Sequence, residues 1–67
     1  MQPEWEYMFV KVWKGKIKAI GNLVYEDERL RPIWEDWLRE QGLRGWQLVS
    51  EYSFQEYSIH ATLKRQL

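Results

Sequence analysis

The hydrophobic periodicity of this 67-residue chain changes twice along its length. Apolar and aromatic residues first alternate with polar ones, then recur at helical spacing, and then alternate again. Successive side chains of a strand point to opposite faces, whereas every third or fourth residue of a helix lies on one side. The order predicts a single α+β domain over residues 1–67. In it, two β-hairpins flank one amphipathic helix (ββαββ), and the helix packs on one face of an antiparallel sheet.

The first hairpin is expected from strand-forming residues on both sides of a turn. Trp5–Trp13 is rich in aromatic and β-branched residues, which suit a pleated strand. Lys14-Gly15 provides a two-residue turn in which glycine takes a positive φ. Residues 16–24 are expected to form the returning strand, with Gly21 as a candidate bulge.

The helix is expected to begin at Leu30 and to run for about three turns. Its apolar stripe, at positions i, i+3, i+4, i+7 and i+8, consists of Leu30, Ile33, Trp34, Trp37 and Leu38. Pro32 fits the first turn, where a missing N–H costs little. Gly42 is expected to cap the helix in the left-handed conformation, and Gly45 to turn the chain into the next strand.

Two further alternating segments, 46–54 and 57–64, predict the second hairpin. In the first segment, the side expected to face the helix carries Trp46, Leu48, Ser50, Tyr52 and Phe54. In the second segment, that side carries Tyr57, Ile59, Ala61 and Leu63.

The register of the first hairpin decides which side of the sheet the helix covers. A two-residue turn pairs Trp13 with Lys16 and, counting back, Phe9 with Ile20. One face then carries small aliphatic residues, and the other carries Trp5, Tyr7, Phe9, Lys11, Trp13, Lys16, Lys18 and Ile20. Because a buried lysine needs a partner or loses its charge, the helix is expected to cover the aliphatic face. An odd-length turn or a bulge at Gly21 would exchange the two faces.

Composition excludes several classes of protein. The absence of cysteine excludes a disulfide and a thiolate metal site. Ten Lys plus Arg balance ten Asp plus Glu, so the whole chain has no field that attracts nucleic acid or an anionic membrane. No apolar run has the roughly 20 residues of a membrane helix, and residues 1–6 do not resemble a signal peptide. We therefore expect a soluble, cytoplasmic protein that does not bind membranes.

The groups that can support catalysis or hold a metal are isolated from one another. His60 has no second histidine or cysteine with which to share a metal ion. The acidic residues 26–28 lack the alternating spacing of a calcium loop, and the glycines of 42–45 lack the spacing of a phosphate-binding loop. A small-molecule pocket of Trp34, Trp37 and Trp46 is a weaker interpretation than a core position for them. We expect no enzyme activity, no metal and no cofactor.

The uncovered face is expected to carry several large aromatic residues. The apolar area of such a patch is larger than a monomer normally exposes. We therefore expect the protein to form a homodimer or a higher symmetric oligomer through this face. The expected interface residues are Trp5, Tyr7, Phe9, Lys11, Trp13 and Ile20. Lysines at the rim would pair with Glu51 or with residues 26–28 of a second copy.

Nucleic acid, or another polyanion, is the alternative partner for the same face. The anion-binding residues would be Lys11, Lys14, Lys16 and Lys18, with Trp5, Tyr7, Phe9 and Trp13 as stacking surfaces. The zero net charge and the lack of arginine on this face weigh against this alternative.

Three segments resemble a family of small bacterial domains of unknown function. They are Trp5-Glu6-Tyr7, the stretch from Leu38 through Gly42, Gly45 and Trp46 to Val49, and Leu63-Lys64-Arg65. The family carries W-E-Y in its first strand, G-x-x-G-W-x-L-V from helix to strand, and a basic last strand. Gln47 stands where the family more often has Glu. The resemblance implies the fold and a bacterial origin, and it transfers no catalytic residue because the family has no assigned activity.

Overall fold

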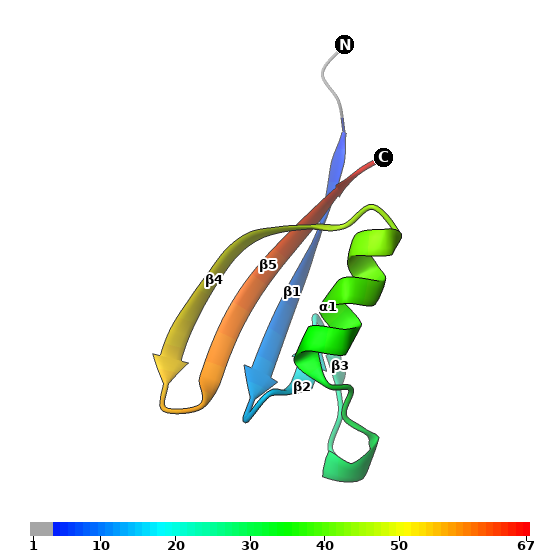
Figure 1. Cartoon of the computed structure of the whole chain (residues 1–67). Coiled ribbons are helices and arrows are strands. Elements are labelled where there is room, and N and C mark those ends of the chain that lie inside the picture. Colours follow the sequence, from blue (N-terminus) through cyan, green and yellow to red (C-terminus); the bar gives the residue numbers. More distant parts are fainter. Residues whose placement is uncertain (1–3) are drawn as a thin grey trace.

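The computed structural model describes residues 4–67, apart from the side chain of Phe54, and has the expected α+β architecture (Figure 1). Its elements are β1 (Trp5–Trp13), β2 (Lys16–Ile20), β3 (Leu23–Val24), the 3-10 helix η1 (Glu28–Leu30), α1 (Trp34–Leu43), β4 (Gln47–Gln55) and β5 (Ser58–Gln66). The strands form one antiparallel sheet of order β3-β2-β1-β5-β4, so β1 is central. The single returning strand expected over 16–24 is wrong beyond Ile20. The chain turns at Gly21, which has φ 56°, and β3 pairs antiparallel with β2, so Gly21 is a turn residue and not a bulge within the strand.

The helix packs on the aliphatic side of the sheet, as expected. Trp34 of α1 is 6% exposed and is buried against residues of β1, β2 and β5. This core consists of Val10, Val12, Ile17, Trp34, Ala61 and Leu63. Trp37 and Trp46 pack against it, and Trp37 stacks on Trp34 with 5.9 Å between ring centres. The three tryptophans are therefore part of the core or pack against it. Most of β4 lies away from the helix (Figure 1).

An irregularity in β2 changes the register expected for the first hairpin. Next to the turn, Val12 pairs with Ile17 as expected, but farther on the register shifts and Val10 pairs with Ile20. Such a shift accommodates one extra residue in one strand of a pair. The expected pair of Phe9 with Ile20 is therefore wrong. Ile20 lies across from a core residue and packs against the core, not on the uncovered face.

A second irregularity, in β4, moves side chains from one face of the sheet to the other. Leu48 lies on the helix side, as expected, but the register shifts between Leu48 and Ser50. Tyr52 therefore pairs with His60 on the uncovered face, and the expected placement of Ser50 and Tyr52 beside the helix is wrong. The side chain of Phe54, expected on the same side, lies outside the described part of the structure.

The helix begins later than its apolar stripe predicts. Leu30 belongs to η1 and is 71% exposed, and Ile33 is the N-cap of α1 and is 53% exposed. The reason is Pro32, because a residue before proline disfavours the helical backbone, and Arg31 has φ −73° and ψ 127°. The chain thus stays extended until Trp34, and the expected first turn with Pro32 does not form.

The end of the helix is formed by Gly45 and not, as expected, by Gly42. Gly42 lies inside α1, whereas Gly45 has φ 91°. The Gly45 N–H donates to the Gly42 carbonyl at 3.1 Å, and the Trp46 N–H donates to the Gln41 carbonyl at 3.1 Å. This pair of hydrogen bonds is typical of a helix that ends at a left-handed residue.

The three segments that carry the family resemblance meet where β1, β5 and the end of α1 come together. Arg65 Nε donates to Glu6 Oε1 at 2.6 Å. The Arg65 guanidinium carbon lies 4.7 Å from the ring centre of Trp46, and Nη1 donates to the carbonyl of Arg44 at 3.4 Å. These motif residues therefore join separate elements of the fold.

Candidate functional site

The side of the sheet opposite α1 is uncovered, and we call it the open face. It includes Trp5, Tyr7, Phe9, Lys11 and Trp13 of β1, Lys16 of β2, Ser50 and Tyr52 of β4, and Ser58, His60, Thr62 and Lys64 of β5. Because β1 is the central strand, its side chains run down the middle of the open face. All the residues expected at an interface, except Ile20, lie on it.

The middle of the open face carries three exposed rings. Phe9 is 62% exposed, Tyr7 57% and Tyr52 56%. Tyr52 was missed as a candidate because the alternation of its strand places it beside the helix, and only the irregularity in β4 brings it here. The next ring along, Trp5, is 36% exposed. The exposed patch is therefore formed by β1 and β4 together, across β5.

Lysines cover the tryptophans at both ends of the open face. Lys64 Nζ lies 4.4 Å from the ring centre of Trp5. Lys14 Nζ lies 4.6 Å from the ring centre of Trp13 and 5.6 Å from that of Tyr57. A cation over an aromatic face is attracted by the ring quadrupole. These contacts shield the end rings, so Tyr7, Phe9 and Tyr52 form the apolar centre.

His60 lies on the open face between Lys11 of β1 and Tyr52 of β4. The Tyr52 hydroxyl and His60 Nδ1 are 3.2 Å apart, and the two rings meet edge to face with centres 5.4 Å apart. This contact fixes the position of the Tyr52 ring within the patch. In the part of the chain that the structure describes, no group of three or more His, Cys, Asp or Glu side chains could hold a metal ion.

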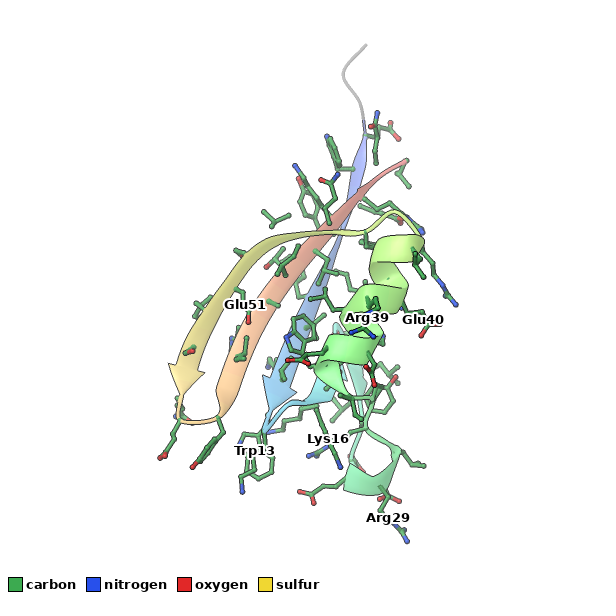
Figure 2. The ribbon with its side chains drawn as sticks, in the orientation of Figure 1. Trp13, Lys16, Arg29, Arg39, Glu40 and Glu51 are labelled. Atoms are coloured by element: carbon green, nitrogen blue, oxygen red, sulfur yellow. The ribbon has the colours of Figure 1, made fainter. Side chains whose placement is uncertain are left out.

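Charge is segregated between the two sides of the sheet. Among the described strands, the acidic residues are Glu6 and Glu51. Glu6 pairs with Arg65 and Glu51 lies across from buried Ala61, so both are on the helix side of the sheet. Figure 2 shows Glu51 on β4, well away from Lys16 at the turn. The strands therefore present lysines but no carboxylate on the open face, although the whole chain is neutral.

The acidic loop expected to meet lysines of a second copy is partly engaged within its own chain. Asp27 caps η1 by accepting a hydrogen bond from the Arg29 backbone N–H at 3.0 Å. The Arg29 side chain donates to the same carboxylate at 3.1 and 3.0 Å. The side-chain hydrogen bonds from Arg29, followed by the backbone hydrogen bond, hold the pKa of Asp27 below its ordinary value.

The isolated chain has more surface than its size requires. Its accessible surface is 5339 Å², whereas a folded monomer of this mass typically has about 4,600 Å². Its radius of gyration is 12.4 Å, against about 11 Å for a compact domain of this length.

Comparison of the chain with protein-family models, with curated proteins and with solved structures found no match in any of the three. No described helix is long and apolar enough to span a membrane.

Proposed function

We propose that this protein is a non-enzymatic interaction module that forms a homodimer or a higher symmetric oligomer through the open face. The observation that supports this most strongly is the exposure of Phe9, at 62%, in the middle of the central strand. Tyr7 and Tyr52 extend the patch on either side of it. Aromatic residues at the centre of an interface usually dominate its binding energy.

The arrangement of charges favours this mode of assembly. Two copies related by a two-fold axis would bring the apolar centres together and leave the lysines over Trp5 and Trp13 at the ends. There the ammonium groups keep their water, while the rings they cover stay shielded. Lys11 is the lysine closest to the centre. Repulsion between the Lys11 ammonium groups of the two copies limits the affinity of the dimer.

The test is the solution mass of matched variants by size-exclusion chromatography with light scattering at micromolar concentration. The wild-type chain is expected to be an oligomer, and Phe9→Glu a folded monomer, because it places a charge at the centre of the patch. Leu30→Glu is the control, since Leu30 is 71% exposed and lies in η1, away from the open face. It should leave the oligomer intact. A monomeric wild type, or an unchanged mass for Phe9→Glu, would contradict the proposal.

Polyanion binding is the second candidate, and the charge segregation favours it. Of the four lysines expected to bind the anion, Lys11 and Lys16 lie on the open face, Lys14 lies at the turn over Trp13, and Lys18 lines a hollow together with Lys11. Lys64 of β5 joins them, and no carboxylate from the described strands lies on this face. Exposed rings between lysines are a surface on which nucleic-acid bases stack. A single-stranded oligothymidine titrated at two salt concentrations tests this. Lys11→Ala should weaken binding and reduce its salt dependence, and Arg39→Ala, on the helix, should not. Absence of salt-sensitive binding rejects it.

A further inference from the structure

A cavity of about 220 Å³ lies outside the centre of the open face, where the first hairpin turn meets the segment after η1. It is lined by Trp13, Lys14, Lys16, Glu28 and Arg31. Three of these side chains are cationic and one is anionic, so the lining carries a formal charge of +2. Figure 2 shows Trp13 and Lys16 side by side at this end of the sheet.

Arg31 is the fixed element of the cavity. Its side chain is only 10% exposed, and Nε donates to the carbonyl of Tyr25 at 2.8 Å. Nη1 lies 3.7 Å from Glu28 Oε1. Among the described residues, none accepts a hydrogen bond from its Nη2. A guanidinium that is held at Nε and lies near a carboxylate at Nη1, with the Nη2 donors left over, is suited to an oxyanion because its position is already set.

Backbone hydrogen bonds tie the segment that carries Arg31 to the turn that carries the two lysines. The Ile17 N–H donates to the Pro32 carbonyl at 2.8 Å, and the Trp34 N–H donates to the Gly15 carbonyl at 2.9 Å. The cationic groups are thus brought together by the fold before any ligand binds. Preorganisation of this kind lowers the cost of binding.

We propose that this cavity binds the phosphate group of a small phosphorylated molecule. A phosphate dianion matches the formal charge of the lining. Lys14 Nζ already lies 4.6 Å from the ring centre of Trp13. One face of this ring is therefore occupied by a lysine, and the charges of the lining select the phosphate group of the ligand. The Glu28 side chain is 68% exposed, and it has room to turn away from an incoming anion.

The site does not rest on the proposed self-association, and its test is separate from it. Inorganic phosphate is titrated into the ¹⁵N-labelled full chain at constant ionic strength, and amide and indole shifts are followed by NMR. Saturable shifts are expected at Gly15, Lys16, Arg31 and the Trp13 indole. Lys16→Ala should weaken binding about tenfold, the change expected from losing one charged hydrogen bond. Because Lys16 is exposed, this variant is expected to fold.

Two further variants distinguish a site from general charge attraction. Glu28→Gln should tighten phosphate binding severalfold, because it removes the one negative charge from the lining. Lys18→Ala is the matched control, since Lys18 lies on the same strand but does not line the cavity. It should leave the dissociation constant within twofold of wild type. Shifts that do not saturate, or an equal loss for Lys18→Ala, overturn the proposal.

Two competitors distinguish the phosphate of a small molecule from the phosphates of a nucleic-acid backbone. Glycerol phosphate is expected to displace inorganic phosphate, whereas an oligothymidine without a terminal phosphate is not. If the oligothymidine competes better, and its binding depends on Lys11, the anion belongs to the open face and the small-molecule site is rejected.

Discussion

The guanidinium carbon of Arg65 lies 4.7 Å from the ring centre of Trp46. The same guanidinium forms an ion pair with Glu6, so one side chain connects the first strand, the last strand and the residue that follows the helix cap. The Cα of Gly45 also faces this arginine, because a Cβ built there would lie 3.6 Å from Arg65 Cδ. Residues of these three segments therefore have a structural role in this chain.

Arg65→Ala should destabilise the fold by about 1–2 kcal/mol, from the lost charged hydrogen bond and the contact with Trp46. Both partners of the ion pair are about one-third exposed, which limits its share of this loss. Urea denaturation measures it. The control is Arg39→Ala, whose ion pair with Asp36 is largely exposed and should contribute at most about 0.5 kcal/mol. Equal losses for the two variants would show that Arg65 has no special role.

Alanine at the two glycines near the helix end should have opposite effects. Gly45→Ala should cost about 1–2 kcal/mol, because φ is 91° at this position. Gly42→Ala should stabilise by about 0.5–1 kcal/mol, because Gly42 is helical and a Cβ there meets open space. Thermal and urea unfolding of both variants give the signs. A loss for Gly42→Ala would indicate that Gly42 is the cap after all.

The Asp27 carboxylate should make stability depend on pH in the acidic range. Its pKa in the folded state is lowered by the Arg29 hydrogen bonds, so its contribution is present above the unfolded pKa and is lost as the pH falls through the folded value. Asp27→Asn should therefore be less stable than wild type at pH 7, and the difference should shrink at pH 2. Urea midpoints at both pH values measure this. A difference that stays constant with pH would contradict it.

Self-association through the open face should also make the thermal stability of the protein depend on its concentration. If only the folded chain assembles, the Tm of the wild type should rise with protein concentration. Phe9→Glu should have a Tm that does not change with concentration, and Leu30→Glu should behave like wild type. Scanning calorimetry over a hundredfold range of concentration is the measurement. A wild-type Tm independent of concentration would place the open face outside any assembly.

Local signals predicted most of the architecture. Lys14 and Gly15, with φ of 50° and 77°, form the expected two-residue turn, because glycine tolerates that backbone and the flanking strands require it. The helical stripe predicts α1, but Pro32 keeps the preceding residue extended, so the helix begins later than the stripe alone indicates. The alternation of side chains along β1 predicted most of the candidate interface. It holds because β1 has no irregularity where it pairs with β5.

By itself, the sequence determined the place of the helix between strands on either side, the first turn and the face that the helix covers, because periodicity, glycine and the cost of burying lysine act locally. It did not determine β3, which forms only by pairing with β2. Only the tertiary structure decided that Ile20 joins the core and that Tyr52 joins the open face. The reason is that an extra residue in one strand is accommodated only against its partner strand, and such a shift reverses the side chains that follow it up to the next shift. That Arg31 and Lys16 line one cavity is likewise decided by backbone hydrogen bonds between their two segments.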